Sequence, residues 1–153
     1  MASQSATERD YYPGDGMDAR KTLALAAEFD GASQVLRKAK FWAPYRLAAL
    51  HAIELYLSAF LRKHGLENEI IRKTGHQFCA KTTLAREHGL LLRAKTQAHL
   101  SNLTCKREYL ITRYDASMLP TLTELTRIDA TLREIATKVT STVEARSARI
   151  QVS

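Results

Sequence analysis

The longest apolar stretch of the chain runs from Phe41 to Gly65 and reads FWAPYRLAALHAIELYLSAFLRKHG. Between Phe41 and Leu61 apolar residues fall on every side of a helical wheel, so a helix here has no face suited to water. Pro44 suits the first turn of a helix, and Gly65, after a run of basic residues, is typical of a helix C-terminus. We therefore predict one long central helix that other helices surround.

Apolar residues also recur at helical spacing before and after this stretch. Asp18 is a suitable N-cap for the first segment, whose middle is weakened by the pair Asp30-Gly31. The pattern predicts one helix or two short ones over 18–40, a connection or helical turn over 66–72, a short helix over 76–88, a long helix over 91–114 and a last helix over 121–146. We expect an all-α fold, an antiparallel bundle of four long helices plus one short helix.

The length of 153 residues suits a single domain with one core. Residues 1–16 are small and polar and include glycine and proline, so we expect a disordered leader. The bundle should span 17–146, and 147–153 should form a frayed tail. Arg46, His51 and Glu54 would lie deep in a bilayer if the central helix spanned one, which argues against a membrane protein.

The cysteines and the net charge indicate which metal sites, cellular location and partners to expect. Cys79 and Cys105 do not stand in a four-ligand zinc pattern, and the N-terminus lacks the apolar core of a signal peptide. We expect ordinary thiols, a cytoplasmic protein and no metal or cofactor. The net charge of +7 favours an anionic partner. Basic residues gather at both ends of the central helix: Arg37, Lys38, Lys40, Arg62, Lys63, Arg72 and Lys73.

His51 and Glu54 lie three residues apart, so they should share one side of the central helix. A carboxylate in such an apolar helix needs a cation or several hydrogen-bond donors opposite it. The candidates are Arg107, Arg113 and His76. Glu54 is then either part of an interhelical ion pair that fixes register or an acid that contacts a ligand.

Two segments, LHAIELYLSAFLRKHGL and the later GHQFCAKTTLAREHGL, resemble the HEPN domain family. The resemblance extends from about Met17 to Arg146. Its strongest matches are the helix around His51 and Glu54, the pair Gly75-His76, and the run from Arg107 and Tyr109 to Arg113 and Tyr114. It implies a bundle of four or five helices, frequent homodimerisation and a role that involves RNA or nucleotides. It also implies prokaryotic conflict or toxin–antitoxin systems, with a nucleotidyltransferase as a possible partner protein.

Catalytic members of that family are metal-independent endoribonucleases, whose signature is an arginine, usually a polar residue next, and a histidine four to six residues further on. Two pairs satisfy the spacing, Arg46 with His51 and Arg93 with His99. Leu47 follows Arg46 and Ala94 follows Arg93, which departs from the polar second position. On a helix the two members of these pairs would also lie about 140° and about 240° apart.

The later tyrosines and arginines suggest a different role. Tyr109 and Tyr114, with Arg107 and Arg113, could stack a base and neutralise a phosphate, although Tyr114 could equally pack in the core. We therefore expect a non-catalytic binding or regulatory module that contacts RNA, a nucleotide or a partner protein through the basic ends of the central helix. The alternatives are a toxin-like endoribonuclease that uses one of the Arg/His pairs, and a purely structural homo-oligomerisation protein.

Overall fold

The computed structural model of the protein describes residues 16–75, 77–105 and 124–145. These residues form helices and no strands, which confirms the all-α class for this part of the chain. The helices are α1 (Ala19–Lys38), α2 (Trp42–Lys63), α3 (Asn68–Thr74), α4 (Phe78–Glu87), α5 (Ala94–Cys105) and α7 (Leu125–Glu144). The expected leader and tail, and the continuation of α5 toward 114, lie outside the described residues.

The first helix is continuous across Asp30-Gly31, which settles the choice left open by the sequence. Asp18 caps it as predicted, since its Oδ1 accepts a hydrogen bond from the Lys21 N–H at 2.8 Å. The side chain of Asp30 faces inward, where it accepts hydrogen bonds from Tyr56 and Arg133. These bonds from α2 and α7 hold the middle of α1 in place.

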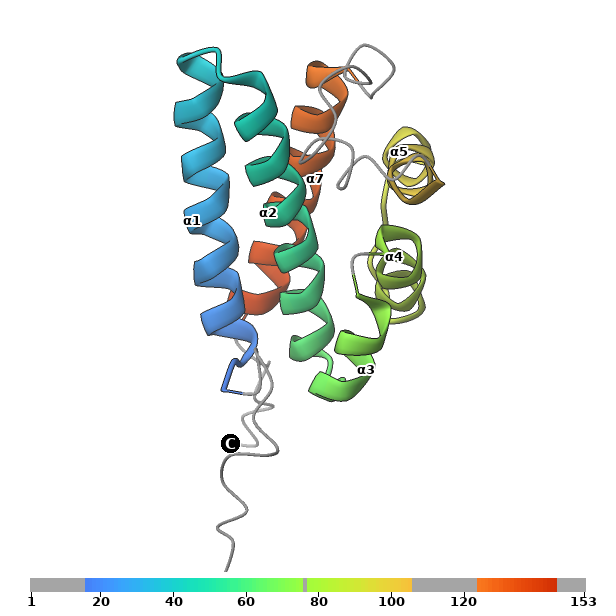
Figure 1. Ribbon diagram of the computed structural model, residues 1–153. Coiled ribbons are helices and arrows are strands. Elements are labelled where there is room, and N and C mark those ends of the chain that lie inside the picture. The colour runs from blue at the N-terminus through green and yellow to red at the C-terminus, as the bar shows by residue number, and fades with distance from the viewer. Residues whose placement is uncertain (1–15, 76, 106–123, 146–153) are drawn as a thin grey trace, which may run out of the picture.

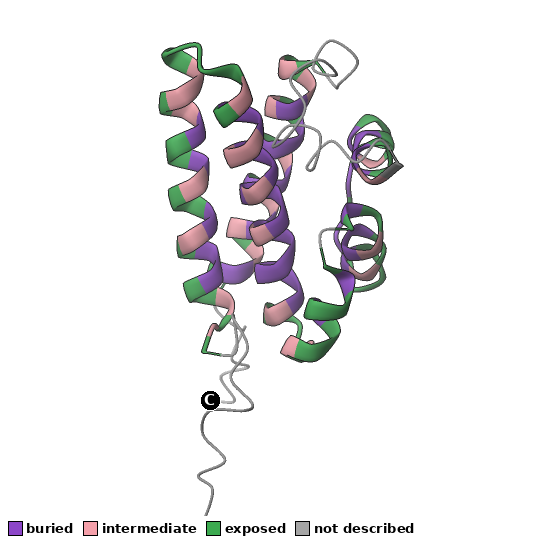
Figure 2. Ribbon diagram, in the orientation of Figure 1, coloured by how far each residue is buried: buried purple, intermediate pink, exposed green. Residues whose placement is uncertain are grey.

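The central helix is α2, and more than half of its residues are buried. It ends at Lys63, and Gly65 follows with φ +81°, as predicted for a glycine at a helix C-terminus; the Leu66 N–H donates to the Leu61 carbonyl at 3.1 Å. Helices α1, α7, α4 and α3 all contact it, so the prediction of a surrounded rod is confirmed (Figures 1 and 2). No described helix is long and apolar enough to cross a membrane.

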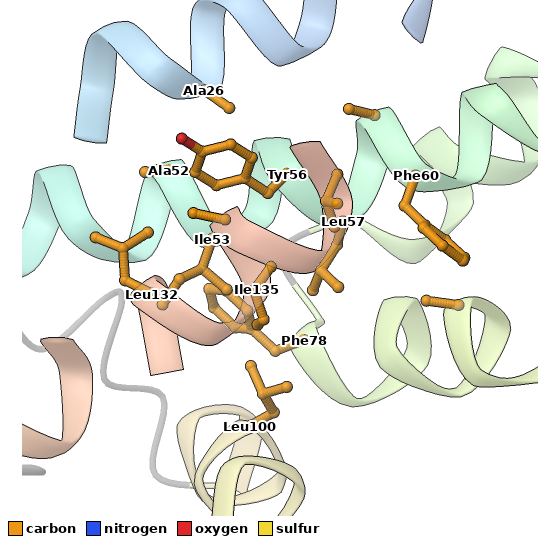
Figure 3. Packing of buried hydrophobic residues seen from close by; sticks show 14 of the residues in the cluster. Ala26, Ala52, Ile53, Tyr56, Leu57, Phe60, Phe78, Leu100, Leu132 and Ile135 are labelled. Atoms are coloured by element: carbon orange, nitrogen blue, oxygen red, sulfur yellow. The ribbon is translucent and has the colours of Figure 1, made fainter. Parts of the chain in front are cut away.

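The bundle is not uniformly antiparallel. Helix α2 runs antiparallel to α1, but α7 runs in the same direction as α2, and α4 and α5 cross beside them (Figure 1). The core lies around α2, where α1 contributes Leu23 and Ala26 and the other side is closed by α7 and the α4–α5 pair. Figure 3 shows Ile53 of α2 and Ile135 of α7 packed near Phe78 of α4 and Leu100 of α5, all of them buried.

Three predicted boundaries differ in the structure. The segment predicted as a connection or helical turn over 66–72 is helical, and it forms a short helix over 68–74. Helix α5 begins at Ala94 instead of Leu91, because the Arg93 N–H is bonded to the Glu134 carboxylate of α7 at its start. Helix α7 begins at Leu125, although residues 121–123, where its start was predicted, lie outside the described part. The β-branched segment near its end is helical, since Val139 and Val143 are fully buried.

Candidate functional site

His51 and Glu54 share one side of α2, as their spacing predicted. The Nδ1 atom of His51 lies 3.8 Å from Oε2 of Glu54. Glu54 is buried, and the Nζ atom of Lys81 on α4 lies 3.9 Å from Oε1 of Glu54. An interhelical ion pair between α2 and α4 therefore exists, with a partner that the sequence did not suggest.

Lys81 is only 3% exposed, which is unusual for lysine. Its Nζ also donates a hydrogen bond to the Gly75 carbonyl at 3.1 Å, at the end of α3. Burial lowers the pKa of Lys81, Glu54 partly opposes that shift, and Arg62 adds to it. The charge of Glu54 thus offsets part of the cost of burying this ammonium group.

A sequence signal for Lys81 did exist. It lies three residues after Phe78 and four before Ala85, on the face of α4 that carries these buried residues. The expected partners Arg107, Arg113 and His76 lie outside the described residues, as do Tyr109 and Tyr114. The predicted aromatic and basic surface on those residues thus stays a prediction.

The first candidate catalytic pair, Arg46 and His51, is not assembled. The His51 ring lies edge-on to the ring of Phe29 in α1, with centroids 4.4 Å apart. Arg46 is buried elsewhere on α2, where its charge acts on His99 of α5. The two side chains thus point to different neighbours, as expected for residues five apart on a helix.

The second pair, Arg93 and His99, is not assembled either. His99 is 3% exposed, and its Nδ1 lies 2.6 Å from Oγ1 of Thr131 on α7. Burial, then the charges of Arg127 and Arg46, lower the pKa of His99 to about 4. Arg93 is exposed just before α5. A neutral, enclosed imidazole has little capacity to take a proton from an RNA 2′-hydroxyl in solvent.

The fold instead combines one member of each pair. Arg46 of α2, His99 of α5 and Arg127 of α7 form a group of basic side chains close enough to interact electrostatically. Within the described part of the chain, Nε2 of His99 and Nε of Arg127 are buried without a hydrogen-bond partner. The two arginine charges and burial oppose protonation of His99, so its imidazole stays neutral between two permanently charged side chains.

The basic residues at the ends of α2 divide into structural and exposed members. Arg37 pairs with Asp129 of α7 at 3.0 Å, and Arg62 donates to the Met17 carbonyl and to Asn68, which ties α2 to the residues just before α1 and to α3. The exposed lysines are Lys38 and Lys40 before α2, Lys63 at its end, and Lys73, which lies 3.4 Å from Glu69. Arg72 of α3 is exposed as well, so a ligand in solvent meets these four lysines and Arg72 first.

Metal ligands do not cluster in the described residues, where no group of three or more His, Cys, Asp or Glu side chains could hold an ion. Cys79 is a free, exposed thiol.

Comparisons of the chain with models of protein families, with curated proteins and with solved structures found no match.

Proposed function

We propose that this chain is a HEPN-like, non-catalytic module that binds single-stranded RNA through the exposed basic ends of its central helix. The observation that carries the proposal is the separation of both candidate Arg/His pairs, with His99 enclosed and its pKa lowered to about 4. The residues that suggested the family would then serve the fold, and binding would fall to the surface lysines. A cytoplasmic homodimer that works with a partner protein such as a nucleotidyltransferase is part of this proposal.

The position of the lysines supports an extended polyanion as ligand. Lys38 and Lys40 precede α2 and Lys63 closes it, and a helix of 22 residues is about 33 Å long. A mononucleotide could contact one end at a time, whereas an RNA strand could contact both. Binding of this kind is dominated by phosphate contacts and weakens as salt rises.

Binding is tested by fluorescence anisotropy with a labelled single-stranded RNA of about 20 nucleotides at several salt concentrations. We expect the affinity to fall with salt, and the double variants K38E/K40E and K63E/K73E each to bind about tenfold more weakly at low salt. The matched control is R86E/K95E, which makes the same charge change on exposed residues of α4 and α5. Equal loss in the control, or affinity independent of salt, would contradict the proposal.

Catalysis is tested separately. We expect RNA to stay intact after long incubation in EDTA with high concentrations of the protein. Cleavage that disappears in His51→Ala or His99→Ala, but not in His88→Ala, would establish the endoribonuclease alternative instead. Intact RNA together with no measurable RNA binding would leave the purely structural oligomerisation protein.

A further inference from the structure

The corner between α1 and α2 carries most of the large apolar side chains that the described part of the chain exposes. Val35 is 67% exposed, Phe41 60% and Trp42 42%. The only other large apolar residues exposed in the described ranges, Ile70 and Leu91, lie elsewhere. Figure 2 shows this corner as an exposed cap at one end of the two helices. Exposed aromatic residues grouped in this way mark a binding surface more often than chance would give.

The backbone of this corner is fixed. Lys40 adopts a left-handed conformation with φ +62°, and the Phe41 N–H donates to the Leu36 carbonyl at 3.0 Å. This is the hydrogen-bond pattern of a helix C-terminal cap in which glycine is the usual residue. A lysine at that position tolerates backbone strain that glycine would avoid. Lys40 is exposed and directly precedes Phe41 in the chain.

The charges around the aromatic residues are positive. Lys38 and Lys40 are exposed, while Arg37 is neutralised by Asp129. Phe41 is the N-cap residue of α2, and its phenyl ring cannot cap the helix, so the positive end of the helix dipole lies at the same corner. An anion is therefore favoured beside Phe41 and Trp42.

We propose that the aromatic corner, defined as Val35, Lys38, Lys40, Phe41 and Trp42, stacks unpaired bases of single-stranded RNA. Aromatic side chains bind the faces of bases while adjacent lysines neutralise the phosphates, and this combination is typical of single-strand binding. In a duplex the faces of the bases are stacked on one another, so the aromatic side chains cannot reach them. A two-fold contact between two copies of the corner would bring its lysines together, so self-association through it is disfavoured. This inference rests on the proposed function and names the place where bases, rather than phosphates alone, are bound.

Trp42 is the only tryptophan of the chain, so tryptophan emission, excited at wavelengths that tyrosine does not absorb, reports on this corner alone. We expect a single-stranded RNA of about ten nucleotides to quench Trp42 emission to saturation. The same sequence paired with its complement, and inorganic polyphosphate of similar charge, should quench it little. If polyphosphate quenches as strongly as RNA, the corner binds anions without stacking and the inference is wrong.

The contribution of stacking is measured by anisotropy, which needs no tryptophan. We expect Phe41→Ala and Trp42→Ala each to weaken binding of labelled RNA by about tenfold. Leu91→Ala is the matched control, because Leu91 is 79% exposed outside the corner, and it should bind as the parent does. Circular dichroism melts establish that the variants are folded.

The outcomes separate this inference from the function on which it rests. Salt-sensitive RNA binding that survives Phe41→Ala and Trp42→Ala would overturn the aromatic corner and leave the proposed function standing. No RNA binding by the parent protein would overturn both. Quenching by vesicles of anionic phospholipid but not by RNA would assign the corner to a membrane surface. Concentration-dependent self-association that is lost in Phe41→Ala would assign it to a second copy of the chain.

Discussion

Arg46 and His99 belong to different Arg/His spacings in the sequence, yet they interact in the folded chain, where the charge of Arg46 helps to lower the pKa of His99. Each would need its sequence partner to form a nuclease site of the expected kind. The fold gives Arg46 a buried position on α2 and encloses His99 against Thr131. Because Arg46 acts on His99, the free energy of unfolding should depend on pH.

We predict that acid destabilises the protein partly through His99. Its pKa is about 4 in the folded state and near 6.5 in the unfolded chain, so its contribution is fully present above about pH 6.5 and is lost as the pH falls toward 4. Between about pH 7.5 and pH 5 the free energy of unfolding should fall by about 2 kcal/mol from this residue. Urea unfolding of the parent and of His99→Asn at both pH values measures how much of this fall in the free energy of unfolding comes from His99. An equal pH effect in the two proteins would show that His99 is not responsible.

A second prediction concerns Glu134, which joins α7 to the start of α5. Its carboxylate accepts hydrogen bonds from the Arg93 N–H at 2.9 Å, from Thr96 Oγ1 at 2.7 Å and from Lys138 at 2.9 Å. We expect Glu134→Ala to lower the free energy of unfolding by about 2 kcal/mol, and Glu134→Gln by about half of that, because an amide keeps part of the cap. Urea unfolding gives the values. Glu87→Gln, on an exposed residue of α4, should leave stability unchanged.

The same carboxylate should add to acid sensitivity. Burial alone would raise the pKa of Glu134, but the hydrogen bonds from Lys138, Thr96 and Arg93 and the charge of Lys138 outweigh it and lower the pKa. Its stabilising effect is therefore present above the ordinary glutamate pKa and is lost as the pH falls through the lowered value. A titration of the side-chain carboxyl by NMR should show the lowered midpoint, and Lys138→Met should raise it. An unchanged midpoint in that variant would contradict the assignment.

A further prediction concerns Asp30, which joins three helices. The Tyr56 hydroxyl donates to Asp30 at 3.0 Å, and Arg133 forms an ion pair with it. Tyr56→Phe should cost about 1 kcal/mol and Asp30→Asn about 2 kcal/mol, since the buried acceptor also loses its charge. A double-mutant cycle should give a coupling free energy of about 0.5 kcal/mol or more, the size expected for residues in contact. Strictly additive costs would show that the hydrogen bond contributes nothing.

The ion pair between Lys81 and Glu54 gives the last prediction. We expect Lys81→Met to destabilise the protein by about 2 kcal/mol, because it removes a cation near a buried carboxylate. In a Glu54→Gln background the same substitution should cost less, since the burial of the lysine charge is then no longer offset. Thermal and urea unfolding of the four proteins measure the difference. Lys73→Met is the exposed control, because Lys73 belongs to a surface pair.

The sequence predicted the features that local chemistry controls. Asp18 was identified as an N-cap and Gly65 as a helix end because each acts on residues next to it in the chain. The central helix was identified because apolar residues on all sides leave it no solvated face. These signals require no knowledge of which helices become neighbours.

The missed features depend on pairing between distant helices. The start of α5 could not be placed without Glu134, which lies 41 residues beyond Arg93. Lys81 was overlooked because a lysine on a helix is usually solvated, and only the packing of α4 on α2 encloses it. The direction of α7 relative to α2 likewise depends on connections that helical periodicity does not encode.

Helix α7 also constrains the order in which the chain can fold. It provides the carboxylate at the start of α5 and the arginine that pairs with Asp30, 103 residues earlier. Helices α1 and α2 can form their hairpin from local contacts as soon as both have left the ribosome, because the corner between them is short. The start of α5 gains its bonds to Glu134 only after the last helix has been synthesised. A nascent chain that stalls before α7 would therefore expose the apolar side of α2 and become a target for chaperones and proteases.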